Sequence, residues 1–126
     1  MIKFVLLISL GGAIGAPLRF IISLVISNYT KFAFPLGTLI VNIIGSFLIG
    51  IFAAIIKNNY YFDETLIKYF FMIGFLGSFT TFSAFSLEVM NLFNIGNYSY
   101  AISYILLSII LNIIAVYLGI NIFKIL

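Results

Sequence analysis

The chain has 126 residues, of which 64% are hydrophobic and 7% are charged, and its formal net charge is +3. Ordinary soluble domains carry roughly 25% charged residues, so this composition cannot coat a water-exposed surface and instead predicts one membrane domain, residues 1–126. The absence of His and Cys excludes disulfides, thiol nucleophiles and His- or Cys-ligated metal sites. The three acids, Asp63, Glu64 and Glu88, are too few and too poorly spaced for a catalytic pair. We therefore expect neither an enzyme nor a nucleic-acid-binding protein.

Four apolar runs are long enough to cross a bilayer, which takes about 20 mostly apolar residues per helix. The predicted transmembrane helices cover residues 4–26, 34–56, 68–93 and 98–123. Short polar loops separate them, so consecutive helices should be antiparallel neighbours in an all-α bundle.

The lysines give a weak signal for orientation in the membrane. Lys3, the loop from Lys57 to Lys68, and Lys124 lie on one side of the predicted bundle, and Lys31 lies on the other. The positive-inside rule favours cytoplasmic termini, but a bias of so few residues permits both orientations.

The first predicted span combines small residues with one deeply placed cation. Gly11 and Gly15, and likewise Gly12 and Ala16, lie four residues apart, a spacing that lets helix backbones approach closely in lipid. Arg19 shares its span with no acid. Because an unpaired guanidinium attracts anions, we expect Arg19 to face a wet vestibule; the alternative is a side chain that snorkels to the membrane surface.

Polar side chains form stripes along the second and fourth predicted spans. Residues four apart share one face of a helix, and the hydroxyl and amide groups of these stripes can all donate hydrogen bonds. Polar groups in lipid are costly unless they are paired or line a wet path. The stripes are therefore either interhelical hydrogen bonds or, as we favour, part of a permeation path. They consist of Thr38, Asn42 and Ser46 in the second span and of Tyr100, Tyr104, Ser108 and Asn112 in the fourth.

The third predicted span has a poor helix centre. Residues 74–86 contain two glycines among hydroxyl and β-branched residues, so we expect the helix to break near Gly77–Thr80. Breaks at membrane depth free backbone groups and usually mark ion sites. Beyond the break, Phe82 and Phe85 lie three residues apart, with Ser83 between them. Their electropositive ring edges could solvate a small anion, or the rings could simply pack in the core.

Three segments of the chain resemble the Fluc/CrcB family of fluoride channels. They are residues 11–19, residues 37–46, and residues 74–86 with Glu88 after them, and the Thr-Thr-Phe-Ser-x-Phe core at 80–85 is highly specific. The resemblance covers nearly the whole chain. It implies passive, fluoride-selective efflux across a bacterial plasma or inner membrane, which lowers cytoplasmic fluoride and its toxicity. It also implies a dual-topology dimer of antiparallel four-helix subunits, with two fluoride paths along the interface and the third helix broken at mid-membrane.

The resemblance further implies roles for single residues. Backbone carbonyls of Gly77 and Thr80 from both subunits would hold a structural sodium ion that is not transported. Arg19 would lie near the vestibule. The implied fluoride path consists of Asn42, Phe82, Phe85, Ser83, Tyr104, Ser108 and Thr38. The chain departs from the family at Ala84, at Ser78-Phe79 and at Asn112. These departures bear on which polar groups complete the implied fluoride path.

Two other functions compete with that of a channel. A small multidrug-type exporter also packs four spans into this length, but exporters of that class use a carboxylate in the first span, where this chain has Arg19. A non-conducting membrane subunit would need neither polar stripes nor a broken third span. The residues alone do not decide between fluoride and chloride, or between a homodimer and pairing with a related subunit.

Overall fold

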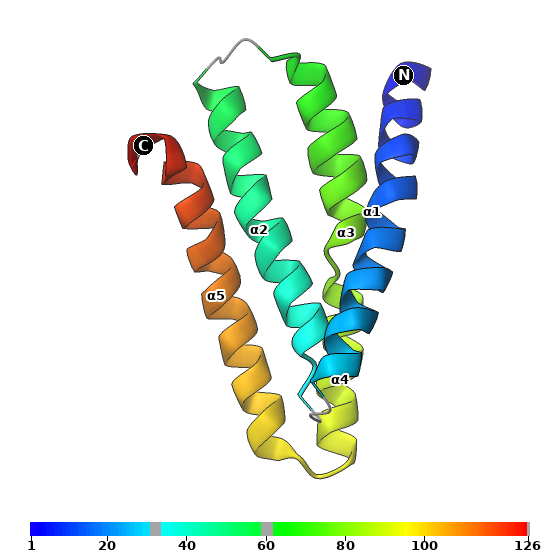
Figure 1. Cartoon of the computed structure of the whole chain (residues 1–126), viewed down its shortest axis with the longest axis vertical. Coiled ribbons are helices and arrows are strands. Elements are labelled where there is room, and N and C mark those ends of the chain that lie inside the picture. Colours follow the sequence, from blue (N-terminus) through cyan, green and yellow to red (C-terminus); the bar gives the residue numbers. More distant parts are fainter. Residues whose placement is uncertain (31–33, 59–61, 126) are drawn as a thin grey trace.

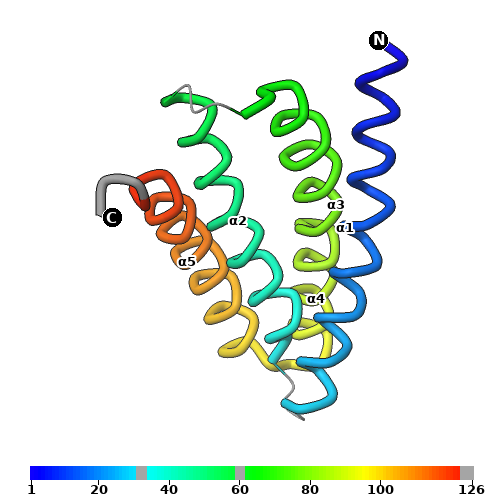
Figure 2. The backbone as a smooth tube through the Cα atoms, turned by 45° about the horizontal axis from the view of Figure 1, so that its top comes forward, coloured from blue at the N-terminus to red at the C-terminus, as the bar shows by residue number. Residues whose placement is uncertain are grey.

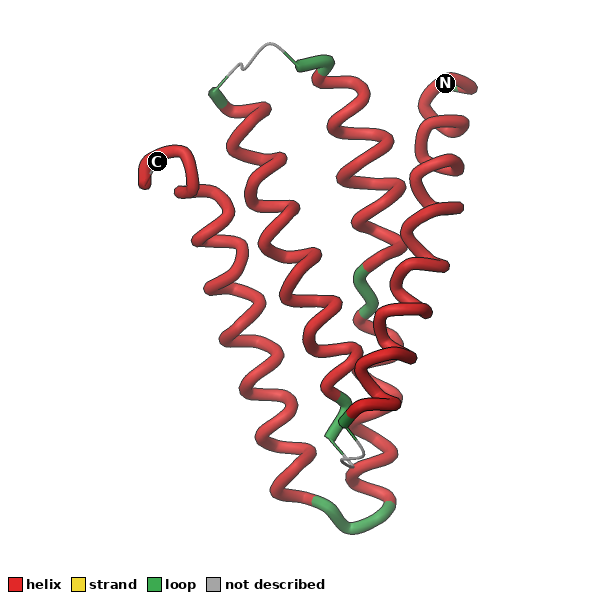
Figure 3. The backbone as a smooth tube through the Cα atoms, viewed as in Figure 1, coloured by secondary structure: helices red, strands yellow, loops and turns green. Residues whose placement is uncertain are grey.

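The computed structural model describes residues 1–30, 34–58 and 62–125, with side chains up to residue 122. Over these residues the fold consists of helices and short connections, without strands (Figure 3). Its elements are α1 (Ile2–Tyr29), α2 (Leu36–Lys57), η1 (Leu66–Leu76), α3 (Gly77–Phe79), α4 (Phe82–Asn94) and α5 (Tyr98–Ile125). Lys31 and the side chain of Lys124, on which the orientation prediction partly depends, lie outside the described residues.

Four helical stretches are long and apolar enough to span a membrane, as the sequence predicts. They cover Ile2–Tyr29, Leu36–Lys57, Leu66–Asn94 and Tyr98–Ile122. The start of α1 and the end of α5 lie at the same end of the bundle (Figure 1). The end of α2 and the start of η1 lie at that end too. The predicted all-α, four-span architecture is therefore confirmed.

The bundle contains two closely packed helix pairs. The order across the molecule is α5, α2, the third span and α1 (Figures 1 and 2). α2 packs chiefly along α5, and α1 packs chiefly along η1. The third span thus lies between α1 and α2. It packs against α1 on one side and contacts both α2 and α5 on the other.

Glycines let the backbones meet in both pairs. A Cβ atom built on Gly74 of η1 would lie 2.6 Å from the carbonyl oxygen of Ile8 and 3.2 Å from Cα of Gly11. A Cβ atom on Gly119 of α5 would overlap the carbonyl oxygen of Phe47 in α2, beside Cα of Gly50 at 3.1 Å. These distances are too short for any side chain, so both helix pairs depend on glycine at their closest approach.

The third span departs from helical geometry at two consecutive threonines (Figure 3). η1, which is wound as a π-helix, continues into α3, and α3 ends at Phe79. Thr80 has a ψ of 160°, and Thr81 has a φ of −153° and a ψ of 122°, so both are extended before α4 begins. Gly77 keeps helical angles, φ −61° and ψ −31°. The extended backbone is therefore confined to the C-terminal end of the Gly77–Thr80 segment and to the residue after it.

Candidate functional site

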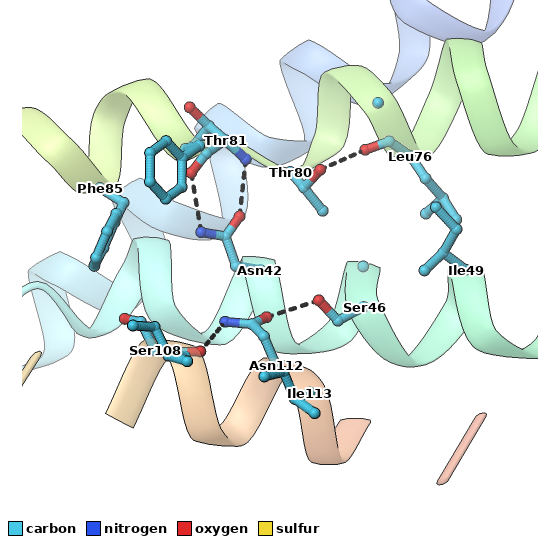
Figure 4. A pocket seen from close by; sticks show the side chains of 14 residues that line it. Asn42, Ser46, Ile49, Leu76, Thr80, Thr81, Phe85, Ser108, Asn112 and Ile113 are labelled. Carbon is cyan, nitrogen blue, oxygen red and sulfur yellow. Dashed lines mark hydrogen bonds between the residues drawn. The ribbon is translucent and has the colours of Figure 1, made fainter. Parts of the chain in front are cut away.

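The side-chain amide of Asn42 in α2 is hydrogen-bonded to the extended backbone (Figure 4). Asn42 Nδ2 donates to the carbonyl oxygen of Thr81 at 3.0 Å, and Thr81 N donates to Asn42 Oδ1 at 2.8 Å. Backbone groups outside a helix need such partners in lipid, because an unpaired group there costs several kcal/mol. Asn42 therefore holds the third span against α2. Its nitrogen carries two N–H groups, so one remains for another acceptor.

Backbone carbonyls lose their usual helical donors at the extended segment, and those of Gly77 and Thr80 are among them. In an α-helix, the carbonyl oxygen of one residue accepts from the N–H four residues later. The N–H of Thr81 would bond Gly77 O but donates to Asn42. The N–H of Ala84 would bond Thr80 O but donates to Thr81 Oγ1 at 3.1 Å, which caps α4. Gly77 O and Thr80 O are thus among the carbonyls, those of residues 77–80, that the end of the helix leaves without a helical donor.

Arg19 of α1 reaches the same segment. Its Nη1 lies 3.4 Å from Thr80 O, which is longer than a well-formed N–H···O bond. Arg19 also lines a hollow of about 450 Å³ between α1, α2 and α4, hereafter the Arg19 hollow. The polar residues that line the hollow with it are Ser23, Thr38, Thr81 and Ser83. A vestibule beside Arg19 would lie here.

A second cavity, the central pocket, lies between α2, α5 and the third span and has a volume of about 380 Å³ (Figure 4). Much of its wall is apolar, including Ile49, Leu76 and Ile113. Its polar side chains all carry amide or hydroxyl groups: Asn42, Ser46, Thr80, Thr81, Ser108 and Asn112. Two residues of each predicted stripe therefore come together at one cavity, whereas Thr38, Tyr100 and Tyr104 lie outside it. Gly77, whose carbonyl has no helical donor, is also in its wall.

Phe82 and Phe85 both line the central pocket, but their environments differ. Their ring centroids are 5.3 Å apart, with the rings tilted by 45°. Phe82 is 78% exposed, whereas Phe85 is 8% exposed and lies 5.1 Å from the Tyr104 ring. Phe82 thus presents its ring to the open side of the pocket, and Phe85 is also part of the core.

Ser108 contributes a buried hydroxyl to the central pocket. Among the described residues, its Oγ has no hydrogen-bond partner, and the side chain is 7% exposed. Leaving such a group unsatisfied costs about 1–3 kcal/mol, and buried polar groups are otherwise nearly always paired. An unpaired hydroxyl in a cavity wall is therefore a donor available to a ligand or to water.

Glu88 of α4 accepts hydrogen bonds from two other helices, and the sequence patterns predicted no role for it. Thr38 Oγ1 donates to Glu88 Oε1 at 2.6 Å, and Tyr104 OH donates to Glu88 Oε2 at 2.7 Å. Two hydroxyls predicted to line a path are therefore bonded to a carboxyl group. The available signal was the acid itself, because an ionisable residue inside a span is by default a functional candidate, and Glu88 lies one helical turn beyond Phe85.

The structure thus divides the predicted site residues among three places, and their part in transport stays a prediction. Asn42, Phe82, Phe85, Ser108, Gly77 and Thr80 line the central pocket. Arg19, Thr38 and Ser83 line the Arg19 hollow. Tyr104 is fully buried and joins Thr38 at Glu88.

Most of the chain is similar to one family of known proteins. Residues 6–120 match the family described as CrcB-like protein, Camphor Resistance (CrcB). A protein of Azobacteroides pseudotrichonymphae, named fluoride-specific ion channel FluC, is 45% identical over 119 residues, covering 94% of each chain. A protein of the same name from Parabacteroides distasonis is 48% identical over 120 residues, 95% of this chain and 91% of the relative. Another, from Francisella philomiragia, is 44% identical over 117 residues, 90% of this chain and 89% of the relative.

Proposed function

This chain belongs to the CrcB family, and we propose that it is a fluoride-selective channel through which fluoride leaves the cell passively. It is a multi-pass membrane protein, and we place it in the plasma or inner membrane of a bacterium. The names of its relatives describe ion channels rather than enzymes. The observation that carries the proposal is the central pocket, because hydrogen-bond donors and phenyl rings gather there in a largely apolar wall.

The pocket supplies groups that could replace the water around a small anion. A lone ion buried without compensation in a dry medium would cost tens of kcal/mol. The second N–H of Asn42 and the unpartnered hydroxyl of Ser108 are donors in the wall. The exposed ring of Phe82 can turn its electropositive edge towards an anion. Such neutral donors bind an anion without trapping it, which conduction requires.

The complete path would need a second subunit. One four-helix bundle has too little interior to wall a polar path from lipid, and Phe82, 78% exposed, borders an open pocket. We propose an antiparallel, dual-topology dimer, formed with another copy or a related subunit of opposite orientation. Two paths would run along its interface, and the extended threonines would lie at mid-membrane. Crosslinks that form only between parallel subunits would contradict this assembly.

A sodium ion would fit the centre of such a dimer. The carbonyls of Gly77 and Thr80 have lost their helical donors, and carbonyl oxygens are hard ligands that suit this cation. When bound, the ion would join the two subunits without being transported. The guanidinium of Arg19 near Thr80 O opposes a second positive charge, so binding requires carbonyls from both subunits. Replacing sodium by N-methyl-D-glucamine should then lower dimer stability, and an unchanged dimer would count against the ion.

The competing function is a small multidrug-type exporter driven by protons. Glu88 is an acid within a span, but it accepts hydrogen bonds from Thr38 and Tyr104, and it lies in the third span rather than the first. An exporter would release substrate only with a proton gradient. A passive channel would release fluoride whenever charge balance is provided.

Fluoride release from proteoliposomes tests the proposal directly. Liposomes loaded with potassium fluoride and containing the purified protein should release fluoride rapidly when valinomycin lets potassium follow, as measured with a fluoride electrode. Chloride-loaded liposomes should release hardly any chloride. Equal chloride release would remove the selectivity claim, and a requirement for a pH gradient would favour the exporter.

A further inference from the structure

A third hollow continues along α5 beyond the central pocket. This outer groove has a volume of about 400 Å³ and extends towards the C-terminal end of α5. Its lining residues are Ser46, Asn112, Ile113, Val116, Tyr117 and Ile120. The first three of these also line the central pocket. The two cavities therefore meet at a single set of side chains.

A hydrogen-bonded pair stands at this junction (Figure 4). Ser46 Oγ of α2 donates to Asn112 Oδ1 of α5 at 2.7 Å. Asn112 Nδ2 donates to the carbonyl oxygen of Ser108 at 2.6 Å. The amide of Asn112 is thus held at both ends and spans the space between the two helices. The second N–H of Asn112 Nδ2 has no acceptor among the described residues.

We propose that the Ser46–Asn112 pair is a closed constriction between the central pocket and the outer groove, and that an anion passes when the Asn112 amide turns away from Ser46. This inference rests on the proposed fluoride function and adds to it a residue pair that sets the rate of conduction. The bridge requires asparagine, because a threonine hydroxyl is too short to bond both Ser46 and its own helix. It also directs the carbonyl dipole of Asn112 into the junction, where an oxygen repels an anion.

The strength of the bridge suits a constriction that opens thermally. Losing one hydrogen bond of this kind shifts a two-state equilibrium by roughly three- to tenfold. Turning the amide breaks its bond with Ser46 and its bond to Ser108 O, and it presents N–H groups where the oxygen stood. It would then lie beside the free Ser108 hydroxyl, so the anion would meet donors on both sides of the junction.

Substitutions of the pair test the constriction through fluoride flux per folded dimer. Ser46→Ala removes the donor, and Asn112→Thr removes the bridge while its hydroxyl can still bond the carbonyl four residues earlier. Each should raise flux about three- to tenfold. The double variant should give no further gain, because both changes break the same bond. Asn112→Leu keeps the bulk without any donor, so flux should fall.

Asn121 provides the matched control. Its Nδ2 makes the same bond to the carbonyl four residues earlier, Tyr117 O at 2.8 Å, but it lines neither cavity. Asn121→Thr should therefore conduct at the wild-type rate.

Each outcome of this experiment supports or overturns the constriction. Wild-type flux in both Ser46→Ala and Asn112→Thr, with lower thermal stability, would make the pair a helix-packing contact. Reduced flux in both would make it an ion-solvating pair, which also overturns the constriction. If the wild-type protein releases no fluoride, the proposed function itself fails, and that result is visible before any variant is compared.

Discussion

The α1–η1 pair and the α2–α5 pair are both packed through glycine, yet they present different chemistry. In the first pair, Gly11 meets Gly74; in the second, Gly50 meets Gly119. Where this pair continues into α3, the hydroxyl of Ser78 is turned onto the backbone and donates to Gly74 O at 2.5 Å. That hydroxyl therefore satisfies a backbone carbonyl next to the α1–η1 pair.

The α2–α5 pair leaves polar groups facing a cavity. Asn42 and Ser46 from α2 and Ser108 and Asn112 from α5 all line the central pocket. Close glycine contact brings the two helices together, and the Ser46–Asn112 hydrogen bond also joins them. The comparison teaches that similar packing serves two ends: the α1–η1 pair supports the extended threonines, and the α2–α5 pair supplies the donors around them.

The largest expected effect comes from a charge in the donor-bearing pair. Asn42→Asp keeps the size of the side chain but replaces the N–H that donates to Thr81 O by an oxygen, and it places a negative charge in the anion path. Fluoride release should fall by about two orders of magnitude or more, since charge burial is so costly. The electrode assay measures it, with Asn121→Asp outside the pocket as the control.

If Asn42→Asp conducts normally, the α2–α5 pair does not line the path. The distinction drawn between the two helix pairs would then be wrong.

Alanine at the glycine contacts tests whether the two pairs are packed alike. A Cβ atom on Gly11 would meet Phe75 N at 2.7 Å, and one on Gly119 would meet Ile51 N at 3.0 Å. Either substitution forces two backbones apart and should cost about 3 kcal/mol. Gly12→Ala is the control, because its Cβ atom would lie at an ordinary 3.7 Å from Ser78 Oγ.

Thermal melting of detergent-solubilised protein, followed by size-exclusion chromatography, measures this difference. Gly11→Ala and Gly119→Ala should lose folded protein, whereas Gly12→Ala should not. A tolerated Gly11→Ala would show that α1 and η1 do not depend on close contact.

The substitutions Phe82→Ile and Phe85→Ile distinguish a ring that lines the central pocket from a ring that packs in the core. Phe82 is 78% exposed, so its substitution should leave thermal melting unchanged. It should lower fluoride flux about tenfold, which corresponds to the loss of a contact with the ion worth about 1.4 kcal/mol. Phe85 is buried beside Tyr104, so its substitution should also lower stability by about 1–2 kcal/mol. Flux per folded dimer and thermal melting together measure both effects.

Wild-type flux in both phenylalanine variants would make the two rings packing residues. The electropositive ring edges would then have no part in solvating the ion.

The helices and the faces of their polar stripes were predictable from the sequence. Apolar run length fixes the spans, because the bilayer fixes the length that a helix must cover. The four-residue spacing places Asn42 and Ser46 on one face of α2, and Ser108 and Asn112 on one face of α5. The structure then brings these two faces to one pocket.

The contacts between distant helices were not predictable in the same way. The extended residues, Thr80 and Thr81, lie at the C-terminal end of the predicted Gly77–Thr80 segment and one residue beyond it, because Asn42 takes the N–H of Thr81 and Thr81 caps α4. The pairing of Glu88 with Thr38 and Tyr104 joins three helices, and no local spacing encodes it. The π-helical winding of η1 likewise leaves no signal in composition.

The Glu88 cluster gives the smallest expected effect on fluoride flux and tests where the donor-bearing face of α2 ends. Thr38→Val and Tyr104→Phe each remove one hydrogen bond to the carboxyl group, which should cost about 1.5–3 kcal/mol. Glu88→Gln should cost less, about 1 kcal/mol, because a hydroxyl can accept from the new amide as well as donate to it. Thermal melting measures all three variants, and fluoride release is measured on the folded fraction.

If Thr38→Val and Tyr104→Phe melt like the wild type but conduct poorly, their hydroxyls solvate the ion, and the donor-bearing face extends from the central pocket to Glu88. If instead they melt early and conduct normally, Thr38 and Tyr104 hold α4 in place, and the path residues of α2 and α5 are those of the central pocket.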